Sequence, residues 1–234
     1  MIIAIDGTSG SGKSTLAKNV AKTLNFGFFS AGALYRALTV KALNLGITPD
    51  EDDKLEYMSE NTDIVYTYDG HKNVMLLDGI DVMDKLHHEE ISENVAKYAC
   101  KPYLREFVRK LQKETALHNE NIVMEGRDIG SVIFPDADLK VYVDCKVESR
   151  AKRRFAECEA RGEKITYEQV LEELKDRDYR DTHREISPLI MCENAFLIDS
   201  SLNNAQECLE LLLREMVRRG LIERHDIKER GFDV

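Results

Sequence analysis

The chain has 234 residues, of which 43% are hydrophobic and 32% are charged, a balance typical of a globular protein with a sizeable core. Its formal net charge of −10 argues against a general nucleic-acid binder, because affinity for a phosphate backbone comes from excess lysine and arginine. Five scattered cysteines without Cys-x-x-Cys spacing predict neither a disulfide framework nor a zinc site, and they favour a reducing, cytoplasmic compartment. We expect no membrane span, since no apolar run approaches about 20 residues, and no cleaved leader before the first strand.

The first predicted element is a strand over residues 2–5, which leads into the sequence Gly-Thr-Ser-Gly-Ser-Gly-Lys-Ser at residues 7–14. This is a complete phosphate-binding loop, and apolar residues at positions 16, 20, 21 and 24 predict a helix after it. Glycines let several backbone N–H groups point at one anion, beside the positive end of that helix. We expect Lys13 to reach the terminal phosphates of ATP and the Ser14 hydroxyl to ligate Mg²⁺. The loop residues expected to bind ATP are Gly7, Thr8, Ser9, Gly10, Ser11, Gly12, Lys13, Ser14 and Thr15.

Short apolar runs alternate with amphipathic stretches along the rest of the chain, which predicts a mostly parallel sheet with helices on both faces. The further predicted strands are 26–29, 122–124, 139–143 and 195–198, and a helix is expected over 205–216. Residues 63–82 interrupt this pattern with two strand-like runs, 64–68 and 74–77, around the turn signal Asp69-Gly70. We interpret this stretch as a small antiparallel insert, and His71 in its turn as a surface residue. The charged tail after Gly220 is expected to be a fraying helix end.

A second group of polar residues, Glu125-Gly126-Arg127-Asp128, directly follows the predicted strand at 122–124. Carboxyl ends of parallel strands line the ligand crevice, so Arg127 is placed to grip a phosphate and Asp128 to hold a polar group of a substrate. An acidic residue here can also reach Mg²⁺ through water. Glu125 and Asp128 both fit that role, and the sequence leaves the choice open.

A third group lies at the end of a helix expected to begin near Tyr167. Residues 177, 181 and 184 are spaced i, i+4 and i+7, so Arg177, Asp181 and Arg184 share one face if the helix runs through. Such a face can clamp a phosphate and a sugar hydroxyl together, while a solvated ion-pair face is the alternative. Upstream, arginines at 150, 153 and 154 precede a glycine-broken connection at 161–164, which is typical of a lid that closes over phosphates. His183 has no metal-ligand spacing and is interpreted as a surface residue.

These motifs together resemble the bacterial cytidylate kinases, the (d)CMP kinase branch of the nucleoside monophosphate kinases. The matching segments are IAIDGTSGSGKST, Gly32-Ala33-Leu34-Tyr35-Arg36, residues 102–105, EGRDIG, residues 150–154, RDYRDTHRE and Ser187-Pro188-Leu189. The resemblance implies an α/β fold of the P-loop NTPase type: a five-stranded parallel sheet flanked by helices, with a nucleoside-monophosphate-binding insert and a short helical lid. We expect one domain over residues 1–234, with the insert at about 62–100 and the lid at about 150–180.

The resemblance also implies an activity, in which ATP and CMP or dCMP give ADP and CDP or dCDP with Mg²⁺. Arg36, Arg105, Arg127 and Arg184 would then hold the acceptor phosphate, Arg177 and Asp128 would approach cytosine and phosphate groups, and Asp181 would take the ribose hydroxyls. Arg153 and Arg154 are the lid residues expected to bind ATP, and Lys13, Arg127, Asp128 and Arg184 are the expected catalytic residues. By the same resemblance the protein is expected to be a cytoplasmic monomer that binds neither nucleic acid nor membranes.

The sequence departs from the family where the base and sugar are read. Ser30-Ala31 replaces the usual Asp-Thr or Asp-Ser, Ala96 replaces a serine that touches cytosine, and Leu86-His87-His88 replaces Ile-Arg-Thr. Each lost hydrogen bond costs about 0.5–1.5 kcal/mol, or roughly three- to tenfold in affinity, unless Ser30, Ser92 or His88 substitutes. Two alternatives therefore stand: a kinase of the same architecture that acts on UMP or another phosphorylated acceptor, and a non-catalytic nucleotide-binding protein.

Overall fold

The computed structural model describes residues 1–68 and 72–232. At its centre lies a five-stranded sheet in the order β2-β6-β1-β7-β8. All of its pairings are parallel. Its strands are β1 (Ile2–Gly7), β2 (Gly27–Ser30), β6 (Ile122–Gly126), β7 (Leu139–Asp144) and β8 (Phe196–Asp199). The predicted strands and the predicted α/β fold class are therefore confirmed.

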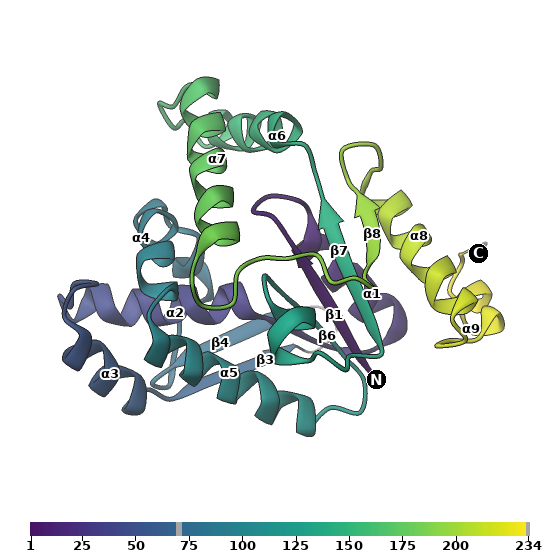
Figure 1. Ribbon diagram of the computed structural model, residues 1–234, viewed down its shortest axis with the longest axis horizontal. Coiled ribbons are helices and arrows are strands. Elements are labelled where there is room, and N and C mark those ends of the chain that lie inside the picture. The colour runs from purple at the N-terminus through teal and green to yellow at the C-terminus, as the bar shows by residue number, and fades with distance from the viewer. Residues whose placement is uncertain (69–71, 233–234) are drawn as a thin grey trace.

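Helices cover both faces of this sheet, because side chains along each buried strand alternate between two apolar cores. On one face Ile5 and Phe28 pack with α1 (Lys13–Leu24) and α8 (Ala205–Arg218). On the other face Ala4, Phe29 and Met124 pack with α2 (Ala31–Asn44) and α5 (Pro102–Leu117). Helices thus cover both faces of the sheet (Figure 1). The segments that follow β1 and β6 lie at its carboxyl-end edge.

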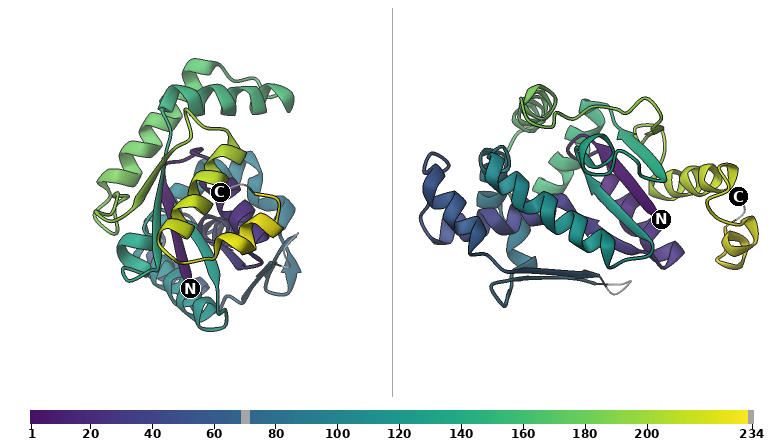
Figure 2. Two further views of the ribbon diagram at one scale, coloured as in Figure 1. Left: turned by 90° about the vertical axis from the view of Figure 1, so that its right-hand side faces the viewer. Right: turned by 60° about the horizontal axis from the view of Figure 1, so that its bottom comes forward.

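The predicted insert is present as a separate antiparallel sheet in the order β3-β4-β5. It contains β3 (Ile64–Tyr68), β4 (Asn73–Leu77) and β5 (Ile80–Asp81), and the 3₁₀ helix η1 (Met83–His87) follows it. Three helices complete this side of the molecule: α3 (Asp52–Glu60), α4 (Glu89–Ala99) and α5 (Figure 2). The expected turn Asp69-Gly70 and the expected surface residue His71 lie outside the described residues.

Past the carboxyl ends of β1 and β7, a pair of helices stands over the phosphate-binding loop (Figure 1). These are α6 (Val147–Ala160) and α7 (Tyr167–His183), which pack on each other around Ala151, Val170 and Leu174. A capping box at Thr166 and Gln169 fixes the start of α7. The lid expected at about 150–180 corresponds to this helical pair.

The tail after Gly220 is not a fraying helix end, and that expectation was wrong. Gly220 adopts φ 69°, which turns the chain, and a separate helix α9 (Arg224–Glu229) follows. Ile227 is completely buried in the core formed by α1 and α8, and Arg230 donates to the carbonyl oxygen of Thr23. The tail therefore packs back onto the end of α1 (Figure 2).

Candidate functional site

The loop at residues 7–14 has the geometry of an anion cradle. Gly10 and Gly12 adopt φ 73° and 88°, the left-handed region that glycine enters without strain, and Gly12 caps the start of α1. Gly7 is needed for a different reason: a Cβ there would lie 2.3 Å from the carbonyl oxygen of Val143. Lys13 is buried, and its Nζ donates to the Thr8 carbonyl oxygen at 3.2 Å. Burial lowers the pKa of Lys13 to about 7, so an arriving phosphate would stabilise its charged form.

Two adjoining cavities open beside this loop. The larger, of about 1100 Å³, is lined by residues 9–15 of the loop and by Arg153 and Arg154 of α6. Of the residues expected to bind ATP, Gly7, the last residue of β1, and Thr8, which follows it, do not line this cavity. Arg153 is held by a hydrogen bond to the Ser200 carbonyl oxygen, and Arg154 pairs with Glu157 at 3.6 Å.

The smaller cavity, of about 270 Å³, collects all of the residues expected to bind the acceptor. They come from three helices (α2, α5 and α7) and from the residues directly after β6 and α7, and are Arg36, Arg105, Arg127, Asp128, Arg177, Asp181 and Arg184. The helix α7 ends at His183, so Arg184 is its capping residue rather than a helical one. The expected common face of Arg177, Asp181 and Arg184 is nevertheless formed, since all three side chains line the same cavity.

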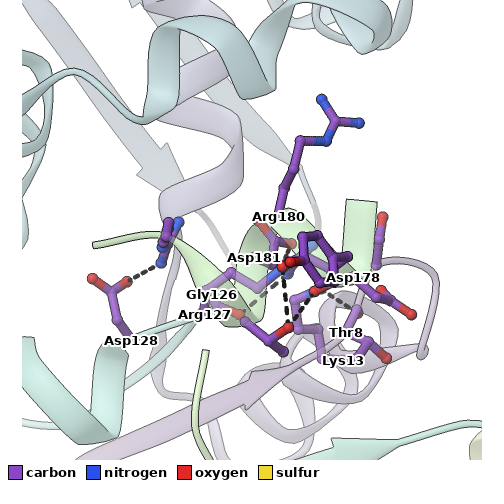
Figure 3. A network of polar contacts seen from close by, with 12 residues as sticks. Thr8, Lys13, Gly126, Arg127, Asp128, Asp178, Arg180 and Asp181 are labelled. Carbon is purple, nitrogen blue, oxygen red and sulfur yellow. Dashed lines mark hydrogen bonds and ion pairs between the residues drawn. The ribbon is translucent and has the colours of Figure 1, made fainter. Parts of the chain in front are cut away.

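Ion pairs hold the arginines of the smaller cavity in place. Arg127 Nε donates to Asp181 Oδ2 at 2.8 Å, in a nearly buried pair close to Lys13 (Figure 3). Arg105 donates to Asp128 Oδ2, and the other oxygen of Asp128 lies 3.9 Å from Arg184 Nη2. The two carboxylates therefore preorganise guanidinium groups that would otherwise repel one another.

Positive charge in this cavity exceeds what these carboxylates neutralise. Arg105 Nε and Arg184 Nη2 are buried and make no hydrogen bond to the described residues. Burial, and then the nearby Arg127, lower the pKa of Arg177 to about 10. Buried, unpaired donors of this kind are costly unless a ligand completes them. An anion in the smaller cavity would supply the missing partner.

Glu125 and Asp128, which the sequence left as alternatives for reaching Mg²⁺, have different surroundings in the structure. Glu125 Oε2 lies 4.0 Å from Lys13 Nζ, and its other oxygen accepts from the Ser30 hydroxyl. Asp128 instead faces Arg105 and Arg184. The Ser14 hydroxyl and Glu125 both line the smaller cavity beside the loop, and such oxygen donors suit Mg²⁺, which keeps water and phosphate ligands. Among the described residues no group of three or more His, Cys, Asp or Glu side chains could hold a metal ion.

Sequence reasoning missed Asp6, which positions the segment after β6. Its carboxylate accepts from the backbone N–H groups of Ile129 at 2.9 Å and Gly130 at 2.8 Å. Burial raises the pKa of Asp6 to about 6 despite these bonds. Asp6 thus ties the end of β1 to the η2 turn (Ile129–Ile133), next to Arg127 and Asp128. The sequence signal that could have identified Asp6 is an acidic residue at the end of an apolar strand, directly before the phosphate-binding loop.

Arg150 fixes the base of the lid rather than facing solvent. It is buried, donates to the carbonyl oxygens of Cys145 at 2.9 Å and Ser9 at 3.0 Å, and forms a bidentate pair with Asp178. One guanidinium therefore joins α6, α7 and the phosphate-binding loop. The ion pair depends on tertiary contact between two helices, so no sequence pattern predicts it.

The positions that depart from the family lie in or beside the smaller cavity. Ala31 and Ala96 line it with methyl groups. Ser30 is already engaged with Glu125, and Ser92 accepts from Arg36 Nη1 at 3.0 Å. His88 lies outside both cavities, whereas the neighbouring His87 lines both of them. Ser30 and Ser92 are therefore already hydrogen-bonded, and His88 lines neither cavity.

Comparison with known proteins agrees with this geometry. The profile of the family described as Cytidylate kinase matches residues 3–218. The cytidylate kinase of Caldanaerobacter subterraneus subsp. tengcongensis is 40% identical over 208 residues, covering 89% of this chain and 91% of that protein. The cytidylate kinase of Stutzerimonas stutzeri is 37% identical over 223 residues, covering 94% and 96%. Among solved structures, TT1252 from Thermus thermophilus aligns with a TM-score of 0.49 at 16% identity, over 93% of this chain and 96% of that one. With a phosphate-binding loop between two cavities and relatives of this similarity over most of its length, the chain belongs to the cytidylate kinase family.

Proposed function

We propose that this protein transfers the γ-phosphoryl group of ATP to CMP or dCMP, giving ADP and CDP or dCDP. The observation that carries the proposal is the arrangement of the two cavities. A donor in one and an acceptor in the other would meet at Lys13, because the cavities share Ser9, Gly10, Lys13, Ser14, Arg36, His87, Ala96 and Arg177. Holding two anionic reactants in line supplies much of the catalysis in phosphoryl transfer.

In this proposal the larger cavity takes ATP and the smaller one takes the monophosphate. Arg36, Arg105, Arg127 and Arg184 hold the acceptor phosphate, since guanidinium groups stay charged and bind phosphate oxygens in pairs. Asp128 and Arg177 approach the base and phosphates. Asp181 keeps Arg127 oriented through Oδ2, and its Oδ1 accepts from the ribose hydroxyls.

Charge on the moving phosphoryl group is neutralised by the residues at the junction of the cavities. Lys13 contacts the terminal phosphates of ATP, and Ser14 and Glu125 hold Mg²⁺ directly or through water. The Mg²⁺ ion supplies electrostatic stabilisation of the phosphate oxygens when it is bound. Arg127 and Arg184 approach from the acceptor side, so no covalent nucleophile of the protein is required.

The proposal extends to the domain organisation, the oligomeric state and the cellular compartment. Residues 1–234 act as one domain, in which the insert at about 62–100 covers the acceptor and the α6–α7 lid excludes water that would otherwise take the phosphoryl group. A monomer suffices, because one chain lines both cavities. A reducing cytoplasm suits the five cysteines, all of which are free thiols. No helix among the described residues is both long enough and apolar enough to span a membrane.

The test is product analysis after incubation of the protein with ATP, Mg²⁺ and CMP. We expect equal amounts of ADP and CDP by anion-exchange chromatography, with little ADP when CMP is omitted. The variant Lys13→Ala serves as the inactive control. Release of inorganic phosphate without CDP would support a nucleotide-binding hydrolase instead.

One observation favours an acceptor other than CMP. Ala31 and Ala96 remove polar groups from the smaller cavity, where the family usually carries hydrogen-bonding side chains. UMP or another phosphorylated acceptor could then compete with CMP. Parallel assays with UMP, dTMP, AMP and GMP distinguish the two proposals.

A further inference from the structure

His87 occupies the junction of the two cavities. It is the last residue of η1 and lines both the larger and the smaller cavity, together with the loop residues Lys13 and Ser14. Any phosphoryl group that passes between the cavities passes this junction. The residue therefore lies beside the transfer path, although it belongs to the insert rather than to the loop.

The backbone on which His87 stands is firmly attached to the core. Leu86 is buried, and its carbonyl oxygen accepts from Arg36 Nη1 at 2.9 Å. The following His88 N–H bonds to the Lys85 carbonyl oxygen at 3.1 Å, which closes the turn. The imidazole of His87, by contrast, makes no hydrogen bond to the described residues. A fixed backbone thus holds an unused donor and acceptor at the junction.

Three cations act on the charge of the exposed His87 ring. Partial desolvation, and then Arg36 of α2, Lys18 of α1 and Arg154 of α6, lower its pKa. The acidic residues that line the larger cavity with it are Glu89 and Glu93 of α4, Glu157 of α6, Glu163, and Glu173 of α7. Within η1 itself the charged neighbours are Asp84 and Lys85. In the free protein this environment favours the neutral imidazole.

We propose that His87 is a phosphate-binding residue of the transfer site, and that its imidazole takes up a proton when nucleotide phosphates enter the junction. This inference rests on the proposed function and adds a residue to it. A phosphate group brings negative charge close to the imidazole and offsets the effect of Arg36, Lys18 and Arg154 that favours its neutral form. The protonated ring then donates a charge-assisted hydrogen bond to a phosphate oxygen.

The proposal fixes the sign of a pH effect. His87 has a lower pKa in the free protein than in the complex, so between these two values binding takes up a proton. Affinity for the phosphate-bearing ligand then falls as pH rises through that window. The variant His87→Arg, which stays charged, removes this dependence, and His87→Asn removes both the charge and the dependence.

The direct test is an NMR titration of the histidine Cε1–H signals between pH 5 and 9. The signal absent from His87→Asn identifies the residue, and His88→Asn is the matched control because His88 is adjacent but outside both cavities. The probes are CMP alone, a non-hydrolysable ATP analogue with Mg²⁺ alone, and both together. We expect the pKa of His87 to rise by about one pH unit or more with both ligands bound. The single-ligand arms show which phosphate contributes most of the rise.

Kinetics supply a second readout. At pH 6 we expect His87→Asn to raise the KM for CMP about tenfold or more, as for one lost hydrogen bond to a charged group, and His88→Asn to leave it unchanged. At pH 8 the wild type should approach the His87→Asn value, while His87→Arg should retain tight binding. CMP that perturbs other signals but leaves the His87 pKa unchanged would overturn this inference alone. No perturbation of any signal by CMP would overturn the proposed function with it.

Discussion

The ion pair between Arg150 and Asp178 offers a sharp test of how the lid is anchored. Arg150 Nη2 lies 2.5 Å and Nη1 3.2 Å from the two oxygens of Asp178. Nη1 also donates to the Ser9 carbonyl oxygen at 3.0 Å, so the pair connects α7 to the phosphate-binding loop. The substitution Asp178→Asn keeps the size of the side chain and removes its charge.

The expected cost follows from burial. Side-chain exposure is 4% for Arg150 and 21% for Asp178, so the substitution leaves a cation almost without water. Removing one partner of a fully buried pair costs roughly 3–5 kcal/mol. Asp178 is partly exposed, and Arg150 retains its bonds to Ser9 and Cys145. We therefore expect Asp178→Asn to lower the free energy of unfolding by about 2–3 kcal/mol.

The assay is urea unfolding at pH 7 followed by far-UV circular dichroism. The matched control is Asp176→Asn, which makes the same chemical change on the same helix at an exposed position. We expect a loss below about 0.5 kcal/mol for that control. Because Ser9 lines the larger cavity, Asp178→Asn should also raise the KM for ATP. Equal unfolding free energies for the two variants would refute the reasoning that Arg150 anchors the lid through Asp178.

Further predictions concern single groups of the site. Arg184→Ala should lower kcat/KM for CMP about 100-fold or more, with little change in the Kd for ATP, because it removes a partly unpaired donor from the acceptor cavity; equal effects on both substrates in steady-state kinetics and calorimetry would contradict this. The pKa of Lys13 is about 7 in the free protein, and bound phosphates favour its charged form. The Kd for ATP should therefore rise as pH increases above about 7, whereas Lys13→Arg should show a flat profile by calorimetry. The pKa of Asp6 is raised from 3.8 to about 6, so its contribution to stability is largest below pH 4 and is lost as pH rises to 6 and above. For Asp6→Asn, the free energy of unfolding measured with urea should not show this fall of roughly 3 kcal/mol. The same pH dependence in the variant and the wild type would contradict the prediction.

Much of the fold could be predicted because buried parallel strands are continuous apolar runs that end in functional motifs. The strand β1 and the loop after it are an example, since the loop motif fixes strand, turn and helix together. The short strand β5, Ile80–Asp81, could not be predicted, because two residues show no periodicity. The helix α9 was missed for a similar reason: its burial depends on Ile227 within a charged segment.

The candidate site shows the same division. The family resemblance assigned the arginine and aspartate residues to one acceptor site, and helical spacing independently grouped Arg177, Asp181 and Arg184. The ion pairs between these arginines and aspartates could not be predicted, since they depend on how strands and helices lie in space. Glu125 lies in β6 beside Ser30, with its carboxylate near Lys13, whereas Asp128 follows the strand and pairs with Arg105. Asp6 and Arg150 act on backbone groups far along the chain, which no local pattern encodes.

The preference for the acceptor base tests the central claim most directly. The measurement is kcat/KM for CMP, dCMP, UMP, dTMP, AMP and GMP at saturating ATP and Mg²⁺, by a coupled assay for ADP. Under the proposed function Asp128, which lines the smaller cavity, approaches the base, so we predict a value for CMP or dCMP at least about tenfold above that for UMP. A value for UMP or a purine nucleotide equal to or above that for CMP would contradict the assignment and identify Ala31 and Ala96 as the positions that changed the acceptor.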